Sequence, residues 1–191
     1  MQLSDIRHRK QFGEYLNSNG LFGFGCEIGV LYGTHAESLL KSWRGMTLFC
    51  VDPWKKFPAS EYIDGAATVD LDEAYFEALN KLAKFPGRVS FVRHESDRAV
   101  EFFSDKFFDF VYIDGNHHMP QVGRDLDNWW LKVRSGGIFC GHDYYNTDLP
   151  YYKCDVKTAV DAFVAKHGLT LHTSIDDSAE DSDASWWIEK P

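Results

Sequence analysis

Short apolar segments alternate along this chain with longer segments in which apolar residues recur every three to four positions. The short segments have the length and residue types of buried strands, and they span residues 21–29, 46–52, 88–94, 107–114 and 136–143. The longer segments have the period of amphipathic helices, and they span residues 34–43, 71–85, 120–133 and 155–168, with a short helix from about Asp97. Strands that alternate with helices predict a three-layer α/β fold built on a Rossmann-like, doubly wound sheet.

The two ends of the chain extend this pattern. Residues 1–20 predict an N-terminal helical segment. Residues 169–175 and 185–190 are strand-like with no helix between them, so we expect a C-terminal antiparallel hairpin on a mostly parallel sheet. The acidic stretch at 176–183 is expected to be a solvated loop. A length of 191 residues fits one domain that covers residues 1–191.

The segment 53–70 interrupts the alternation of strands and helices. It contains two prolines and shows no clear period. Loops of this length usually carry function or are disordered. We therefore predict that residues 53–70 form a loop over the mouth of an active site.

Composition narrows the class of partner. The formal net charge is −9, the pI is about 5.3, and the basic residues form no stripe. A phosphate backbone requires such a stripe, so nucleic acid is excluded as the main partner and a small-molecule substrate is favoured. No apolar run approaches the ~18 residues of a membrane span, so no membrane partner is expected.

The four cysteines lie far apart, and three of them fall within apolar, strand-like segments. Buried thiols are therefore favoured over disulfides or metal ligands. Without an apolar leader at the N-terminus, the expected compartment is the cytoplasm. A homo-oligomer is compatible with the sequence but is not indicated by it.

The residues that follow the first two predicted strands suggest a cofactor with an adenosine part. Gly29 and Gly33 bracket the turn into the first helix, and Asp52 follows 23 residues after Gly29, where an acid can accept both hydroxyls of a ribose. The motif is E-x-G-x-x-x-G rather than the G-x-G-x-x-G of dinucleotide-binding proteins. Glu27 within the turn would repel a pyrophosphate and attract an α-ammonium group, which favours S-adenosylmethionine over NAD.

These motifs resemble those of class I S-adenosylmethionine-dependent methyltransferases, over nearly the whole chain from about residue 20. The matching strings are "EIGVLYGTHAESLL", "VDPW" and "FDFVYIDGNHHMPQVGRDLDNWWLKVRSGGIFCGHDY". The last string is similar to the small-molecule O-methyltransferases related to macrocin O-methyltransferase. The resemblance implies O-methylation of a hydroxylated small molecule, such as a sugar or a phenolic compound.

The resemblance also implies a role for individual positions. Glu27, Gly29 and Gly33 would hold the methionine end of the cofactor, with Tyr32 in the same turn. Asp52 would bind the ribose and Asp114 would lie beside the sulfonium. The two remaining cofactor positions are Trp54, expected to line the pocket, and Ser96, expected to contact the adenine.

A divalent metal is the first of two alternatives for the chemistry. Asp114 ends the fourth strand, and His142 and Asp143 end the neighbouring fifth strand, so these three side chains could bind one ion. Metal-dependent relatives have an all-oxygen set at these positions, which suits magnesium. The histidine here shifts the preference toward manganese, iron or zinc.

A metal-free base is the second alternative. His117 or His142 would then accept the proton of the acceptor, because histidine titrates near neutral pH. The neighbouring His118 is expected to face solvent. Outside the site, the pair Trp129 and Trp130 is expected in the core.

Three other functions compete with methyl transfer. A nicotinamide oxidoreductase is disfavoured by the glycine spacing, and a metallophosphoesterase by the missing D-x-H and G-D-x-x-D motifs. A non-catalytic binding module with this fold stays open, although the acidic positions after the first, second and fourth strands are intact.

Overall fold

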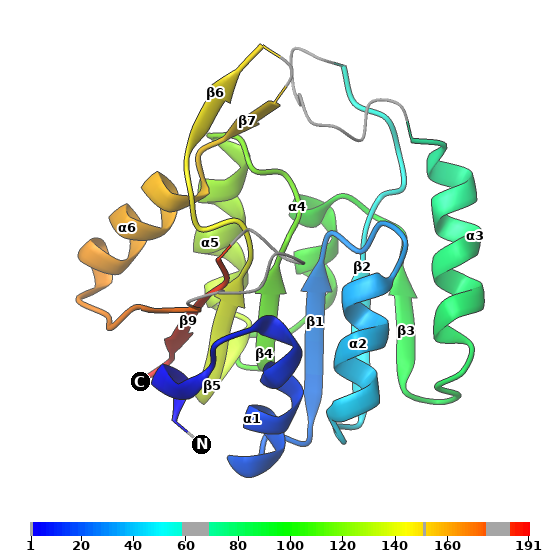
Figure 1. Ribbon diagram of the computed structural model, residues 1–191, viewed down its shortest axis with the longest axis horizontal. Helices are drawn as coiled ribbons and strands as arrows, with labels where there is room; N and C mark the ends of the chain where they lie inside the picture. The colour runs from blue at the N-terminus through cyan, green and yellow to red at the C-terminus, as the bar shows by residue number, and fades with distance from the viewer. Residues whose placement is uncertain (1, 59–68, 151, 175–183) are drawn as a thin grey trace.

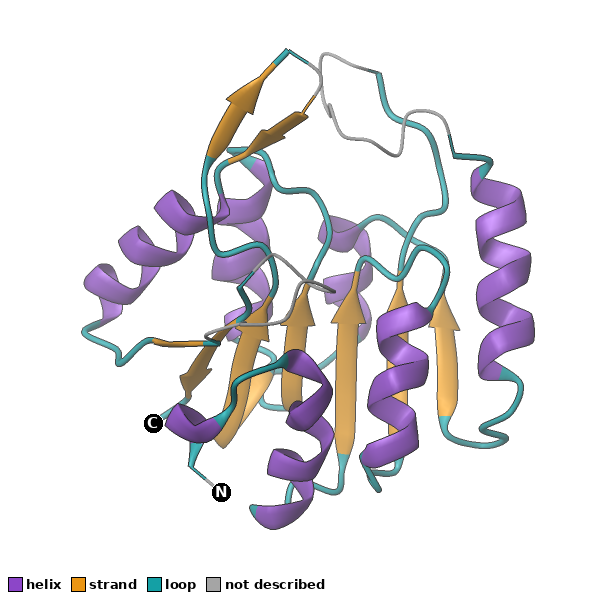
Figure 2. Cartoon of the chain, viewed as in Figure 1, coloured by secondary structure: helices purple, strands orange, loops and turns teal. Residues whose placement is uncertain are grey.

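The computed structural model of the chain describes residues 2–58, 69–150, 152–174 and 184–191. A seven-stranded sheet lies between two groups of helices, which gives the three layers seen in Figures 1 and 2. The strands are β1 (Phe24–Ile28), β2 (Thr47–Val51), β3 (Val89–Val92), β4 (Phe108–Ile113), β5 (Val133–Gly141), β8 (His172–Thr173) and β9 (Trp186–Glu189). Their order in the sheet is β3-β2-β1-β4-β5-β9-β8.

The sheet is parallel from β3 to β5 and antiparallel at β9 and β8. This arrangement confirms the Rossmann-like α/β fold and the C-terminal antiparallel pair. The chain reverses its direction of winding between β1 and β4, and this is where open α/β sheets bind their ligands.

Each face of the sheet packs against its own group of helices. One core cluster joins the sheet to α1 (Phe12–Ser18), α2 (Thr34–Ser42) and α3 (Leu71–Leu82). The other joins it to α4 (Ser96–Ala99), α5 (Gln121–Trp130) and α6 (Val156–His167). In the part of the chain that the structure describes, three short 3₁₀ turns complete the helical elements, and these are η1 (Leu3–Asp5), η2 (Arg9–Gln11) and η4 (Val100–Phe102).

Successive strand residues contribute to opposite core clusters, as the two-residue period of a strand requires. Trp186 lies in the cluster with α5 and α6, and Trp187 lies in the cluster with α1 and α2. Trp129 is fully buried, as predicted, and Trp130 is half-buried against the same cluster. The cysteines are all buried and free, which confirms the prediction of buried thiols.

The boundary between α5 and β5 differs from the prediction. The helix ends at Trp130, not at residue 133, and the strand begins at Val133 rather than at residue 136. Val133 pairs with Phe108 of β4, and the register then shifts before Phe110 pairs with Ile138. An apolar residue at position 133 fits both the helical period and a strand, so only the pairing with β4 decides between them.

A hairpin of β6 (Thr147–Leu149) and β7 (Tyr152–Cys154) was not predicted. It stands beyond the carboxyl ends of the large sheet, at the top of Figure 1. Strands of three residues around a proline are too short to show an alternating pattern. In the predicted active-site loop, residues 59–68 lie outside the described residues, as does the acidic stretch at 176–183.

None of the helices within the described ranges combines the length and the apolar character that crossing a bilayer requires.

Candidate functional site

A cavity of about 540 Å³ opens at the carboxyl ends of β1, β2 and β4. Its walls come from the turn after β1, the segment after β2, the start of α4 and the turn after β4. The predicted positions that line it are Glu27, Gly29, Tyr32, Asp52, Ser96, Asp114 and His117. The start of the predicted active-site loop also contributes, through Pro53, Lys55, Lys56 and Phe57.

The turn after β1 requires glycine at two positions. Gly29 has a φ of 84°, and a Cβ placed there would lie 1.9 Å from the carbonyl oxygen of Asp114. The backbone after β1 packs directly against the backbone after β4, and only a residue without a side chain fits at position 29. Gly33 has a φ of 68° and is the N-cap of α2.

Asp52 connects the ends of the first two strands. Its Oδ2 accepts hydrogen bonds from the backbone N–H groups of Val30 at 2.8 Å and Leu31 at 3.0 Å. Its Oδ1 accepts from the N–H of Trp54 at 2.7 Å. A carboxylate has about four acceptor positions, so Asp52 both fixes the turn and keeps acceptor capacity toward the cavity that it lines.

Trp54 does not have the place that the resemblance implied. It is not among the described residues that line the cavity, and its side chain is only 3% exposed. The indole packs against Tyr75, with ring centroids 4.7 Å apart, and donates through Nε1 to the carbonyl of Leu31 at 2.8 Å. Trp54 is therefore a core residue that stabilises the turn after β1 through its hydrogen bond to Leu31.

Leu31 and Trp54 have left-handed backbones, with φ of 45° and 41°, and Asp143 after β5 has a φ of 55°. Non-glycine residues in this region are uncommon and cost of order 1–3 kcal/mol each. Each of them follows a strand at the edge where the cavity lies, so the surrounding hydrogen bonds hold the rim of the site in a strained conformation.

Glu27 is a buried acid at the floor of the cavity. Its Oε1 lies 3.2 Å from Nδ1 of His35, and its Oε2 is buried without a hydrogen-bond partner among the described residues. Burial raises the pKa of Glu27 well above its usual value, the charge of Asp114 raises it further, and Arg9 opposes this rise. A cationic group bound in the cavity would stabilise the ionised carboxylate.

Ser96 lines the cavity, but its hydroxyl already has partners. Its Oγ donates to Oδ1 of Asp125 and accepts from Nε1 of Trp129 at 2.7 Å. Asp125 is 1% exposed, lines the same cavity and also accepts from Nε2 of Gln121 at 3.0 Å. Burial raises the pKa of Asp125 to about 7, against the opposing effect of these hydrogen bonds.

Asp125 was not predicted as a site residue. It lies in a helix with charged neighbours, where an acid is usually solvated, and only the packing of α5 on α4 buries it. Arg9 was also not predicted as a site residue. The structure places it in the cavity wall, with Nη1 3.6 Å from Oδ2 of Asp114.

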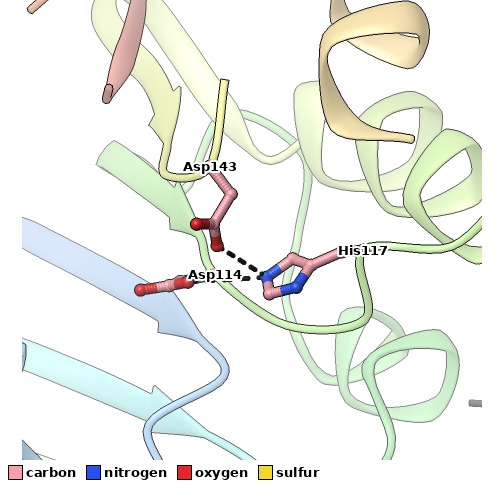
Figure 3. A group of neighbouring side chains, drawn as sticks. All are labelled: Asp114, His117 and Asp143. Atoms are coloured by element: carbon pink, nitrogen blue, oxygen red, sulfur yellow. Dashed lines mark ion pairs between the residues drawn. The ribbon is translucent and has the colours of Figure 1, made fainter. Parts of the chain in front are cut away.

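Three residues converge beside the cavity, Asp114 and His117 from the loop after β4 and Asp143 from the loop after β5 (Figure 3). Nε2 of His117 lies 3.0 Å from Oδ2 of Asp143 and 3.7 Å from Oδ1 of Asp114. One ligand atom from each residue lies within 4.8 Å of the others, as a shared metal ion requires. Burial lowers the pKa of His117, but the two carboxylates outweigh this effect and raise it to about 10.

This group differs from the predicted metal set of Asp114, His142 and Asp143. His117 takes the position between the two acids, and the ring of His142 instead lies with Nδ1 3.3 Å from the other oxygen of Asp143, Oδ1. Neither His142 nor Asp143 is among the described residues that line the cavity. His142 therefore contacts the carboxylate oxygen of Asp143 that does not face His117.

His118 does not face solvent, as had been expected. Its side chain is buried, and the residue is 9% exposed. The backbone N–H of His118 donates to Oδ1 of Asn116 at 2.9 Å. This tight turn directs His117 toward the acids and His118 into the protein.

Comparisons with solved structures support the same fold. The O-methyltransferase TomG from Streptomyces achromogenes, in complex with S-adenosylmethionine, has a TM-score of 0.65 at 14% identity, over 96% of this chain and 79% of that chain. The N-methyltransferase NodS from Bradyrhizobium japonicum has a TM-score of 0.61 at 15% identity, over 96% of this chain and 94% of that chain. A third structure, the 1,6-didemethyltoxoflavin-N1-methyltransferase from Burkholderia thailandensis with bound S-adenosylhomocysteine, has a TM-score of 0.61 at 14% identity, over 96% of this chain and 79% of that chain.

Comparisons of sequence give a family but no individual relative. No curated protein matches the chain. A family model described as a methyltransferase domain matches residues 26–144, which contain the turn after β1, Asp52, Ser96 and the Asp114–Asp143 region. This match covers more than half of the chain, and it favours methyl transfer over a nicotinamide oxidoreductase. The chain belongs to this methyltransferase domain family.

Proposed function

We propose that this protein transfers a methyl group from S-adenosylmethionine to a hydroxyl group of a small molecule, such as a sugar or a phenolic compound. The observation that carries the proposal is the position of Asp114. It lines the cavity that would hold the cofactor, and it also belongs to the group with His117 and Asp143 whose ligand atoms lie close enough together to hold a metal ion. We also propose that the chain is related to the small-molecule O-methyltransferases of the macrocin O-methyltransferase type.

The cavity suits S-adenosylmethionine in charge and in hydrogen bonding. The unpartnered Oε2 of Glu27 would accept from the α-ammonium group, and the backbone of the turn at Gly29 would approach the methionine part closely. Asp52 would accept from the ribose hydroxyls, and the wall at Ser96 and Asp125 would lie against the adenine. Asp114, which would lie beside the sulfonium, would also attract its positive charge.

The group Asp114, His117 and Asp143 suits a divalent cation. Ligands at about 2.1 Å from a metal ion lie roughly 3 Å apart when adjacent, and the separation of 3.0 Å between His117 Nε2 and Asp143 Oδ2 has this size. Two carboxylates and one imidazole favour manganese over magnesium. Such a cation would lower the pKa of an acceptor hydroxyl and fix its oxygen near the methyl group.

The chain's own residues would position the cofactor and the bound cation, and the acceptor hydroxyl, with its pKa lowered, would release its proton to solvent. The carbon–sulfur bond of the sulfonium breaks as the bond between the methyl carbon and the acceptor oxygen forms, so the acceptor must have lost its proton by then. With a pKa of about 10, His117 already carries a proton at neutral pH and cannot accept another. A metal-free mechanism with His117 as the base is therefore disfavoured, and His142 could serve only through Asp143, with which it is paired.

The structural neighbours include N-methyltransferases as well as an O-methyltransferase. An oxygen acceptor is favoured because a cation held by Asp114, His117 and Asp143 would lower the pKa of a hydroxyl group. A neutral amine needs no such help, since its lone pair is already available for methyl transfer. The acceptor would be a small molecule, since the rim of the cavity combines cationic and acidic residues and forms no basic stripe. The buried, free cysteines fit a reducing compartment such as the cytoplasm.

The decisive experiment has two stages. Calorimetry first measures the affinity for S-adenosylhomocysteine, and binding is expected for the wild type but not for NADH. A panel of catechols, phenols and sugars is then incubated with S-adenosylmethionine and Mn²⁺, and formation of S-adenosylhomocysteine is measured. Loss of turnover in Asp114→Asn and Asp143→Asn, and after chelation, is expected. Turnover that survives chelation but is lost in His117→Ala would instead support the metal-free base.

A further inference from the structure

His35 lies beside Glu27 in the cavity wall, although nothing in the sequence motifs gave it a role. It is the second residue of α2, just after the turn closed by Gly33. Its Nδ1 is 3.2 Å from Oε1 of Glu27, and its side chain is 8% exposed. Both residues line the cavity.

The ring of His35 is held from its other side. It stacks on the ring of Tyr112, with centroids 4.2 Å apart and an angle of 26° between the planes. Tyr112 is fully buried in β4, and its hydroxyl is hydrogen-bonded to Oγ of Ser185 at 3.1 Å. A continuous set of contacts therefore runs from the residue before β9, through β4, to the carboxyl group of Glu27.

This arrangement leaves the two oxygens of Glu27 in different states. Oε1 has His35 as its partner, whereas Oε2 has none among the described residues although it is buried. A buried polar atom without a partner costs free energy, and the cost is larger for a charged group than for a neutral one. Such an atom at a cavity wall indicates a position that a ligand group completes.

We propose that His35 is a positioning residue that fixes the carboxyl group of Glu27 so that Oε2 is presented to the α-ammonium group of S-adenosylmethionine. The inference rests on the proposed function, because it assigns the contact partner of the cofactor's amino-acid part. Without His35, the carboxyl group of Glu27 can rotate and take other partners. The affinity should then fall only for ligands that carry the amino-acid part of the cofactor.

A purely structural role for His35 predicts a different result. Disturbed packing at the start of α2 would alter the whole cavity and weaken every ligand that binds there. A positioning role weakens only ligands with an α-amino group. S-adenosylhomocysteine and 5′-methylthioadenosine separate the two cases, because they share the adenosine part and the thioether, and only the first has the amino-acid part.

Two substitutions of His35 provide the matched variants. His35→Phe keeps an aromatic ring against Tyr112 and removes the hydrogen-bonding nitrogen, whereas His35→Asn keeps a hydrogen-bonding group near Glu27. Calorimetry should show that His35→Phe weakens S-adenosylhomocysteine about tenfold, the size of one hydrogen bond to a charged group. The same variant should bind 5′-methylthioadenosine within about twofold of the wild type, and His35→Asn should restore most of the affinity for S-adenosylhomocysteine.

A double substitution shows whether His35 acts through Glu27. Glu27→Gln is expected to weaken S-adenosylhomocysteine by itself, and adding His35→Phe should then have little further effect. Equal weakening of both ligands by His35→Phe, or additive effects in the double variant, would overturn the inference. Failure of the wild type to bind either ligand would instead overturn the proposed function, so the two failures are distinguishable.

Discussion

Nε2 of His117 lies 3.0 Å from Oδ2 of Asp143, although the two residues belong to different loops of the chain. On its other side, the same nitrogen lies 3.7 Å from Oδ1 of Asp114. The two carboxylates therefore share one positively charged imidazole, and this raises the pKa of His117 to about 10 although burial acts in the opposite direction. A proton thus takes the place between two acids that a divalent cation would occupy in the proposed mechanism.

The first prediction concerns the exchange of this proton for a metal ion. Mn²⁺ binding to the chelated protein at pH 7.5 should release about one proton per ion, because a histidine ligand must be neutral. Calorimetry in buffers of different ionisation enthalpy measures the released proton. His117→Gln should bind Mn²⁺ more weakly and release none, whereas binding without proton release in the wild type would place the ion elsewhere.

The second prediction concerns the stability of the metal-free protein. The folded pKa of His117 lies above its unfolded value of 6.5, so its stabilising contribution is complete below about pH 6.5 and is lost as the pH rises toward 10. Chemical denaturation of the chelated protein should show this loss, and the loss should be smaller in Asp143→Asn. The titration of His117 followed by NMR should shift to lower pH by about one unit or more in that variant. An unchanged titration would show that Asp143 does not stabilise the protonated form of His117.

The third prediction concerns the turn after β1. Gly29→Ala should destabilise the protein by more than about 3 kcal/mol, because a left-handed alanine costs roughly 1 kcal/mol and its Cβ would also clash with backbone. Gly87→Ala is the matched control, since Gly87 has a similar φ of 74° with nothing within 4 Å of an added Cβ. Denaturant titrations of both variants measure the difference, and equal losses would mean that the contact between Gly29 and Asp114 is not tight.

The fourth prediction concerns Asp125. Its folded pKa of about 7 lies above the unfolded value of 3.8, so its contribution is present at low pH and is lost as the pH rises through 7. Asp125→Asn keeps an oxygen that accepts from Ser96 and Gln121 but cannot ionise. Its stability relative to the wild type should therefore increase by roughly 4 kcal/mol between pH 4 and pH 8.

A control on the same helix tests whether this effect is specific. Asp127 is largely exposed and pairs with Lys166 at 2.8 Å, so Asp127→Asn should change stability by less than about 1 kcal/mol at either pH. A difference between Asp125→Asn and the wild type that does not change with pH would show that Asp125 is ionised throughout.

The elements of the fold were predictable where a local pattern has only one interpretation. The strands and helices from residue 21 to residue 168 follow the apolar periods, and the glycine after α6 ends that helix at Gly168, with a φ of 62°. Prediction was wrong at Val133, which suits either neighbouring element, and it did not find β6 and β7, which are too short to show a period. In these places the pairing with another strand decides the structure.

The sequence by itself determined the chemistry that is available at the strand ends. Parallel strands place their carboxyl ends at one edge of the sheet, so Glu27, Asp52 and Asp114 were certain to lie near one another once the elements were assigned. The tertiary structure alone decided which side chains point into that space. It placed His117 rather than His142 between the two acids, moved Trp54 into the core, and brought Arg9, His35 and Asp125 into the cavity wall. The physical reason is that a side chain's direction depends on the backbone angles of a single turn and on the helix packed behind it, and neither leaves a periodic pattern in the sequence.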